Sequence, residues 1–100
     1  MSRSVVWSRT ARADLRLQLA YISDQSQKSA VSVSQRITER IAKLAHMPTG
    51  HRGRVDGTFE AGVQLTSLIV VYRLLGNEKL QIVRIIHTSR HWQKGEWPAD

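Results

Sequence analysis

Residues 59–87 read FEAGVQLTSLIVVYRLLGNEKLQIVRIIH, and their periodicity sets the fold class. Apolar and polar residues alternate over 59–64, as in a strand with one buried face. Residues 68–75 are almost continuously apolar, which is typical of a central strand covered on both faces. A Gly-Asn pair at 76–77 predicts a tight turn, and residues 80–87 are again rich in Ile and Val. We therefore expect three consecutive antiparallel strands that form a meander.

Two helices are predicted ahead of this meander. Ser8 offers an N-cap, and apolar residues then recur at helical spacing, which predicts a helix over 9–26. The apolar positions are Ala11, Leu15, Leu19 and Ile22. A polar break at 24–29 separates this helix from a second helical period over 30–44. The second helix is expected to stop before Pro48, because the residue preceding a proline is pushed out of helical geometry.

The order of elements indicates an α+β fold. Residues 3–7 are rich in β-branched and aromatic side chains and predict a first strand. Helices grouped before a run of strands are typical of a sheet with helices on one side. We expect the first strand to join the C-terminal antiparallel meander, with the helical hairpin packed on one face. The chain is interpreted as one domain over 1–100, with a core of about 3–90 and a tail of about 91–100.

A basic loop separates the helices from the meander. Residues 49–57 contain three glycines, which predict turns with unusual backbone angles. The whole chain is basic, with 15 Lys and Arg against 8 Asp and Glu and a formal charge of +7. Such a charge favours a polyanionic partner: nucleic acid, an anionic membrane surface or an acidic protein. The alternative is that the charge serves only solubility.

Several classes of protein are excluded by composition. The chain has no Cys, so disulfides and thiolate metal sites are absent. The four His residues show no recognised metal spacing, and we expect no metal and no cofactor. The first residues lack the apolar run of a signal peptide, and no stretch approaches the roughly 18 apolar residues of a membrane span. A cytoplasmic protein without a membrane partner is therefore expected.

Short motifs along the chain together resemble the RelE/ParE superfamily of type II toxins, with the ParE-like members closer. Their order and spacing over about residues 5–92 carry the resemblance. The motifs are Val6-Trp7-Ser8 with Ala11, Ala13-Asp14-Leu15 and Tyr21-Ile22; Pro48, Gly50 to Arg54, Gly57-Thr58 and Glu60; Ile69 to Arg73; and Ile82 to His87 with Arg90 and Trp92. The resemblance implies a β-α-α-β-β-β fold and the toxin component of a toxin–antitoxin module. It also implies a cognate antitoxin that wraps the toxin with an extended, often acidic segment.

The superfamily divides by target, and the chain departs from its nuclease members. RelE-type members cleave mRNA on the ribosome, whereas ParE-type members poison DNA gyrase. Ribonuclease members often place an Arg three residues before the Tyr of the strand that here contains Tyr72, but that position is Ile69. They also tend to have a C-terminal His or Tyr or several loop lysines, whereas here the chain ends in residues 97–100 (WPAD) and its loop lacks Lys. We therefore expect a ParE-like toxin that inhibits gyrase without being an enzyme. The alternatives are a metal-independent, ribosome-dependent mRNA endonuclease and a non-toxic basic nucleic-acid-binding module.

If the chain is a nuclease, Arg84, His87 and Glu60 are the candidate catalytic residues. RNA cleavage by the 2′-hydroxyl needs a base, an acid and cations for the charge on the phosphate. Glu60 or His87 supplies the base or acid, and Arg84 a cation. The alternative for Glu60 is an exposed strand residue paired with a neighbouring Arg. In an unbulged strand Arg84 shares one face with Ile82, and His87 shares the other face with Val83.

Other basic and aromatic residues are candidate binding residues. Contacts to nucleic acid or to the target are expected from Arg52, Arg54, Arg73, Arg90 and Trp92. For Trp92 the alternative is that it folds back on the core. A helical hairpin beside a sheet offers the antitoxin a groove for an apolar helix and an edge for an added strand. Acidic antitoxin side chains are expected at Arg12, Arg16, Arg36 and Arg40, for which the alternative is a solvated helix face.

Overall fold

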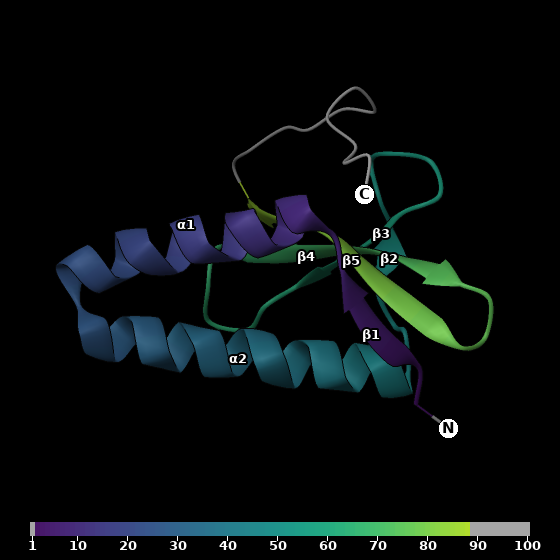
Figure 1. Ribbon diagram of the computed structural model, residues 1–100, viewed down its shortest axis with the longest axis horizontal. Coiled ribbons are helices and arrows are strands. Elements are labelled where there is room, and N and C mark those ends of the chain that lie inside the picture. Colours follow the sequence, from purple (N-terminus) through teal and green to yellow (C-terminus); the bar gives the residue numbers. More distant parts are fainter. Residues whose placement is uncertain (1, 89–100) are drawn as a thin grey trace.

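The computed structural model describes residues 2–88 and has a five-stranded mixed sheet with two helices on one face (Figure 1). The elements are β1 (Ser4–Trp7), α1 (Arg9–Gln25), α2 (Gln27–His46), β2 (His51–Arg52), β3 (Phe59–Gly62), β4 (Leu68–Leu75) and β5 (Lys79–His87). The strand order is β1-β5-β4-β3-β2, with β1 parallel to β5 and the other neighbours antiparallel. The predicted α+β fold and its C-terminal meander are confirmed. The two-residue strand β2 was not predicted.

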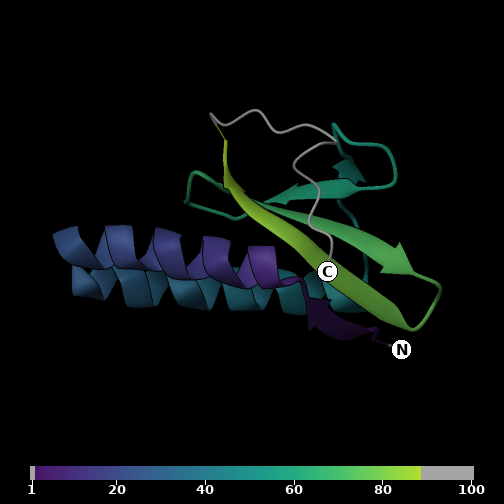
Figure 2. The same cartoon turned by 45° about the horizontal axis from the view of Figure 1, so that its top comes forward.

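The two helices form a hairpin whose closed end projects beyond the sheet (Figure 2). Ser8 caps α1 as predicted, since its Oγ accepts the Ala11 N–H at 2.9 Å. The polar break predicted over 24–29 contains the boundary between the helices but is too long, because Ser26 is the only residue between them. Ser26 is extended and its Oγ accepts the Ser29 N–H at 3.1 Å. The polar residues around it are largely exposed and helical, so polarity located the boundary but not the length of the break.

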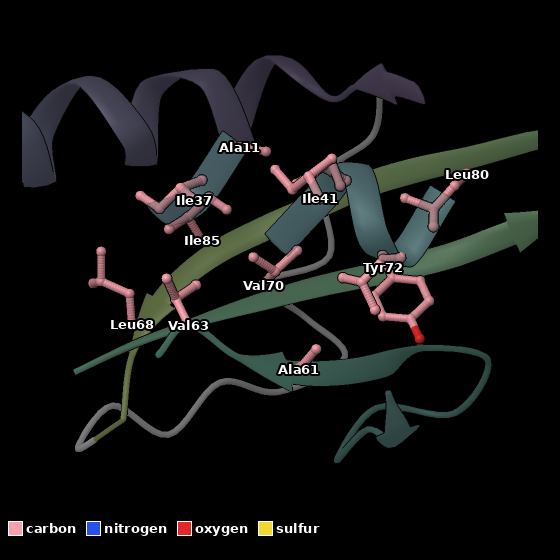
Figure 3. Close-up of a cluster of buried hydrophobic side chains, with 12 residues drawn as sticks. Ala11, Ile37, Ile41, Ala61, Val63, Leu68, Val70, Tyr72, Leu80 and Ile85 are labelled. Atoms are coloured by element: carbon pink, nitrogen blue, oxygen red, sulfur yellow. The ribbon is translucent and has the colours of Figure 1, made fainter. Parts of the chain in front are cut away.

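The main core lies between the helices and the sheet (Figure 3). Its fully or almost fully buried members are Ala11, Ile37, Ile41, Leu44, Ala61, Val63, Leu68, Val70, Tyr72, Leu80, Ile82 and Ile85. The ring of Phe59 stacks on that of Tyr72 with centroids 5.6 Å apart. A second apolar cluster lies on the other face of the sheet and comprises Val55, Val71, Val83 and Ile86, with Ile69 against it. The expectation that β4 is covered on both faces is therefore confirmed.

Strand β5 contains a bulge that shifts its side-chain alternation. Tyr72 pairs with Ile82 but Val71 pairs with Arg84, which leaves one extra residue in β5. Ile82 belongs to the helix-side cluster, whereas Val83 belongs to the cluster on the opposite face. Arg84 lies opposite Val71 and so does not share a face with Ile82. That part of the expected alternation is wrong because it assumed an unbulged strand.

The glycines of the loop after α2 serve two different purposes. Only Gly57, with φ 86°, has the unusual backbone angle that was expected of all three. Gly50 instead lies where its neighbours leave no room for a side chain. A Cβ there would lie 2.5 Å from the Tyr72 hydroxyl and 2.9 Å from the Glu60 carbonyl oxygen. Gly53 is similarly confined, since a Cβ would lie 2.3 Å from the Thr58 Oγ1.

We expect Gly50→Ala to lower the free energy of unfolding by about 2 kcal/mol, as overpacking a close-packed site does. The Glu60 carbonyl is backbone and cannot move aside as a flexible side chain could. Gly62→Ala is the matched control, because a Cβ at Gly62 meets nothing within 4 Å. Urea unfolding of the two variants measures the difference. Equal stabilities would contradict the role assigned to Gly50.

Candidate functional site

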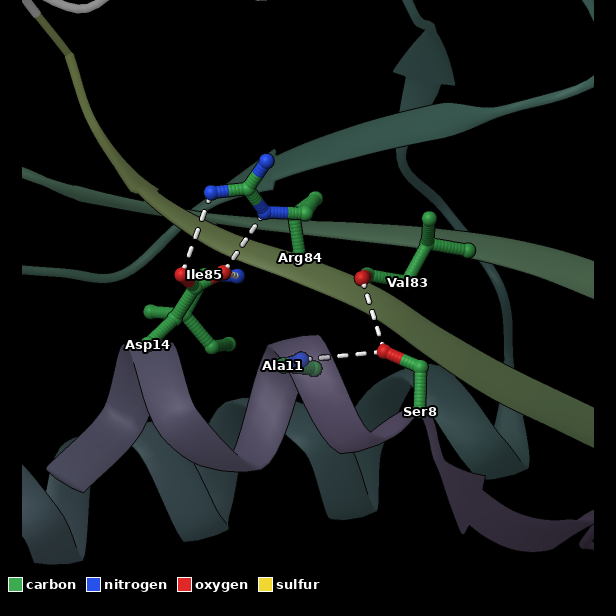
Figure 4. Close-up of polar contacts among 6 residues, drawn as sticks. All are labelled: Ser8, Ala11, Asp14, Val83, Arg84 and Ile85. Carbon is green, nitrogen blue, oxygen red and sulfur yellow. Dashed lines mark hydrogen bonds and ion pairs between the residues drawn. The ribbon is translucent and has the colours of Figure 1, made fainter. Parts of the chain in front are cut away.

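Beyond the end of β1, Ser8 and the first turns of α1 make further hydrogen bonds to β5 (Figure 4). Trp7 is the last β1 residue paired with β5, and Ser8 then donates its N–H to the Ile82 carbonyl at 3.0 Å. The Ser8 hydroxyl donates to the Val83 carbonyl at 2.9 Å. Six residues later, Asp14 Oδ2 accepts the Ile85 N–H at 3.0 Å. Side chains of α1 thereby take the place of a neighbouring strand along the bulged part of β5.

Arg84, a candidate catalytic residue, forms a two-pronged ion pair with the same Asp14. Its Nε lies 2.8 Å from Oδ2 and its Nη2 lies 3.1 Å from Oδ1. The side chains of Arg84 and Asp14 are only 8% and 14% exposed. Bidentate pairs of this kind are stronger and more directional than ordinary hydrogen bonds. Sequence reasoning did not single out Asp14 as the partner, because the pair joins residues 70 apart in the chain.

Glu60 is buried and bound to the loop that precedes β3. Its Oε2 accepts the Arg54 backbone N–H at 2.9 Å and lies 3.3 Å from the Arg54 Nε. The expected pairing with an Arg therefore exists, but the exposed position envisaged for Glu60 is wrong, since the residue is only 3% exposed. Both Glu60 and Arg84 pair across the sheet with Val71, from opposite sides. Their backbones are thus about 10 Å apart, two strand spacings, and each side chain has its own partner.

His87 lies apart from both of these ion pairs. It ends β5 opposite Leu68, a member of the helix-side core, whereas Arg84 lies opposite Val71. The exposed His87 lines a hollow of about 250 Å³ between α1, α2 and the start of β4. The other residues of that hollow are Gln18, Tyr21, Ile22, Val33, Thr66, Ser67 and Leu68. The structure therefore does not bring the three candidate catalytic residues together.

The candidate contact residues are spread over the sheet. Arg52 is exposed opposite Phe59, at the β2 edge. Arg73 donates from Nε to the Gln81 side chain on the neighbouring strand. The Arg54 side chain contacts Glu60 and is 32% exposed. Arg90 and Trp92 lie outside the described residues.

Two of the four arginines predicted to bind the antitoxin, Arg36 and Arg40, line a basic groove. The groove has a volume of about 350 Å³ and runs between α2 and the residues that end β3. Its lining residues are Arg36, Glu39, Arg40, Lys43, Gly62, Val63 and Gln64. Arg40 Nε donates to the Gly62 carbonyl at 3.0 Å across this groove. Arg12 and Arg16 are exposed on α1 and are not part of the groove lining.

Tyr72 lies on β4, opposite Phe59 of β3, and has a structural hydroxyl. The Gly50 N–H donates to this hydroxyl at 2.8 Å. Burial raises the pKa of Tyr72 above its ordinary value, while the Gly50 hydrogen bond and the charges of Arg40 and Arg3 act in the opposite direction. Because the pKa is raised, the phenol is protonated at neutral pH. It therefore holds the loop to the sheet and is not poised to act as a base.

Comparison with known proteins identifies the family. The model of the ParE toxin of the type II toxin–antitoxin system, parDE, matches residues 5–92. The chain belongs to the ParE toxin family. The resemblance to the RelE/ParE superfamily, closer to ParE, is thereby confirmed. No curated protein sequence matches the chain.

Two solved structures share the ParE fold seen here. The chromosomal ParDE toxin–antitoxin system from P. aeruginosa matches with a TM-score of 0.75 and 24% identity, over 86% of this chain and 96% of that one. The RelBE2 toxin–antitoxin complex from Mycobacterium tuberculosis matches with a TM-score of 0.56 and 20% identity, over 87% of this chain and 99% of that one. At these identities the likeness concerns the fold. Within residues 2–88, neither helix of this ParE-family chain has the length and apolarity needed to cross a membrane, and no cluster of three potential metal ligands occurs.

Proposed function

We propose that this ParE-family toxin inhibits DNA gyrase through protein contacts and is neutralised by a cognate antitoxin. The observation that carries the proposal is the separation of Arg84, Glu60 and His87. Arg84 and Glu60 are each bound to their own partner, and His87 lies on the other face of the sheet. A general acid or base must come within hydrogen-bonding reach of the reacting group. Residues held this far apart do not form a nuclease site, which supports action by binding.

The basic surface supplies the contacts that such a toxin needs. Arg52 and the partly exposed Arg54 lie at the β2 edge, and we assign the target contact to this region, with Arg73 nearby on the sheet and Arg90 and Trp92 in the tail. The antitoxin is assigned to the helical side of the molecule. There, Arg12 and Arg16 on α1 and Arg36 and Arg40 on α2 are available to acidic side chains. Both assignments use charge complementarity, which steers association.

Induction in a bacterial host tests the target. After induction of the wild-type chain, mRNA 5′ ends and gyrase-linked DNA breaks are mapped in the same cells. The proposal expects DNA breaks with intact mRNA. Codon-phased mRNA cuts without DNA breaks would instead establish the ribosome-dependent endonuclease. Direct nucleic-acid binding that weakens steeply with salt, without growth arrest, would indicate the non-toxic binding module.

His87→Ala is expected to leave growth arrest unchanged within about threefold. His87 is exposed, ends a strand and lies on the other face of the sheet from Arg84 and Glu60, so its side chain is not a member of either ion pair. For a residue acting as general acid or base, the loss would be about a hundredfold or more. Growth after induction, normalised to the amount of folded protein, is the measurement. A hundredfold loss of toxicity with normal folding would return His87 to the catalytic candidates.

A further inference from the structure

Leu65 has an unfavourable backbone conformation in the connection between β3 and β4. Its φ is 61°, and it is the only non-glycine residue with a positive φ among residues 2–88. The Thr66 N–H donates to the Val63 carbonyl at 3.2 Å, which closes a turn with Leu65 at its third position. Turns with a positive φ at that position usually have Gly or Asn there, because a larger side chain is strained. The leucine therefore lowers the stability of the turn.

The Leu65 side chain makes little contact with the rest of the fold. It is 78% exposed, which is the highest value among the large apolar side chains found exposed in residues 2–88. Apolar surface in contact with water is itself unfavourable. The stability of the fold therefore does not explain a leucine that is both strained and exposed. Residues of this kind are concentrated at functional sites, which makes Leu65 a candidate contact to another molecule.

The hollow of about 250 Å³ that contains His87 lies next to Leu65. The two residues that follow Leu65 in the chain line this hollow, together with residues of α1 and α2. Its apolar lining residues are Tyr21, Ile22, Val33 and Leu68. A cavity of roughly 150 Å³ holds a benzene molecule, so the hollow has room for a leucine side chain. A protruding leucine and a hollow able to receive one are thus neighbours on the same surface.

The surface around the hollow is apolar and carries almost no charge. It lies where the helical hairpin projects beyond the sheet (Figure 2). Tyr21 is 67% exposed, and Leu17, one helical turn earlier on α1, is 71% exposed. Residues 17–23, 29–35 and 61–72 contain no Asp, Glu, Lys or Arg, although the chain has a formal charge of +7. Protein interfaces have cores that are similarly depleted in charged residues and enriched in tyrosine.

We propose that this surface joins two copies of the chain in a symmetric dimer, in which Leu65 of each copy enters the hollow of the other. A two-fold axis makes this contact twice, because the leucine and the hollow lie side by side on each copy. Two chains of formal charge +7 repel one another. A surface without Lys and Arg lets them meet without like charges in contact. An acidic protein or a nucleic acid would instead bind the basic surfaces.

The size of the surface sets the strength expected of the dimer. The exposed parts of Leu17, Tyr21 and Leu65 amount to about 100 Å² each. Two copies together therefore bury roughly 600 Å² through these side chains. Stable dimers bury more than about 1,000 Å². We accordingly expect a weak, reversible dimer with a dissociation constant of about 100 µM.

Leu65→Asn tests the leucine without destabilising the fold. Analytical ultracentrifugation of the purified full chain, over about 5 to 500 µM, measures self-association. Asparagine tolerates a positive φ, so we expect association to weaken at least tenfold while the thermal midpoint of the dilute protein rises by about 2–4 °C. Val31→Asn is the matched control, because Val31 is 56% exposed but lines a different hollow. It should change association less than threefold.

Substitutions in the hollow test the other half of the contact. Gln18→Lys places a positive charge in the hollow of both copies, whereas Gln35→Lys makes the same change in a different hollow of the hairpin. We expect Gln18→Lys to weaken association at least tenfold and Gln35→Lys to leave it within threefold. The chain has no Cys, so introduced cysteines report single positions. Under oxidation, a mixture of Leu65→Cys and Gln18→Cys chains should form a mixed disulfide dimer, whereas Leu65→Cys with Gln35→Cys should not.

Salt distinguishes this dimer from two basic chains bridged by a polyanion. Association should persist or strengthen at about 0.5 M NaCl, because salt screens the repulsion between the copies. A dimer that dissociates as salt rises would indicate a bridging polyanion and would overturn the proposal.

Three further results would contradict the dimer. A wild-type chain that remains monomeric at about 500 µM is the most direct. Association of Leu65→Asn as strong as that of the wild type would exclude Leu65 from the contact, and equal losses in Gln18→Lys and Gln35→Lys would exclude the hollow. If the wild type is monomeric but folded Leu65→Asn no longer arrests growth, the surface binds a different protein and not a second copy.

Discussion

Arg84→Ala is expected to lower the free energy of unfolding by about 3 kcal/mol, because removing one partner of a buried ion pair leaves the other charge uncompensated. Asp14 would retain the Ile85 N–H but lose both bonds to the guanidinium. Both side chains are largely buried, at 8% and 14% exposure, so water replaces the lost contact poorly. Urea unfolding of purified protein measures the change. A loss below about 0.5 kcal/mol, the range of ordinary surface substitutions, would show that the pair is not structural.

A double-mutant cycle distinguishes the pair from the two residues taken singly. Asp14→Leu and Arg84→Met each break the pair, and the double variant leaves neither charge buried. We expect the double variant to be more stable than the sum of the single losses predicts, by more than about 1 kcal/mol. Additive losses would show that the two side chains act independently. Arg84→Lys is a further control, because an ammonium keeps the charge but not the two-pronged geometry.

This result bears directly on how toxicity data for Arg84 are interpreted. An Arg84→Ala chain that fails to arrest growth looks like a catalytic knockout if folding is not measured. The Asp14 contact offers a different explanation, since Arg84 helps to fix α1 against β5. Asp14→Leu decides between the two, because Asp14 was not predicted to take part in RNA cleavage. If both variants lose stability and toxicity together, the role of Arg84 is structural.

Local patterns in the sequence were sufficient to predict the helices and the meander. The cap at Ser8 and the long apolar run of β4 depend on neighbours in the chain and were found where expected. Strand β2 was missed because two residues carry no periodicity. The bulge in β5 was missed because its sequence of alternating and continuous apolar residues fits a regular strand equally well. Each miss reflects a feature that is set by neighbours distant in the chain.

The candidate site was less predictable than the fold for the same reason. The sequence identified Arg84 and Glu60 as noteworthy, but not the partners that bind them. Asp14 meets Arg84 only because α1 lies along the edge that β1 leaves open. The basic groove likewise requires α2 to pass beside Gly62. Residue types therefore indicated charge and its approximate location, whereas the topology determined which charges meet.

Leu44→Ala is expected to lower the free energy of unfolding by about 3 kcal/mol, within the range measured for large-to-small changes in close-packed cores. Leu44 is 0% exposed in the helix-side core, so the shortened side chain leaves a cavity. Leu17→Ala is the matched control, since Leu17 is 71% exposed on α1 and should change stability by less than about 0.5 kcal/mol. Thermal and urea unfolding of the two variants provide the comparison.

The same pair of variants serves as a stability control in the experiments on toxicity and antitoxin binding. Leu44 contacts the core from α2, the helix that also carries the basic groove, so its loss tests how far destabilisation alone weakens antitoxin binding. If Leu44→Ala still binds the antitoxin tightly, reduced stability alone does not weaken antitoxin binding. If Leu44→Ala binds the antitoxin weakly, the groove depends on the packing of α2. A stable Leu44→Ala chain would contradict the placement of Leu44 between the helices and the sheet.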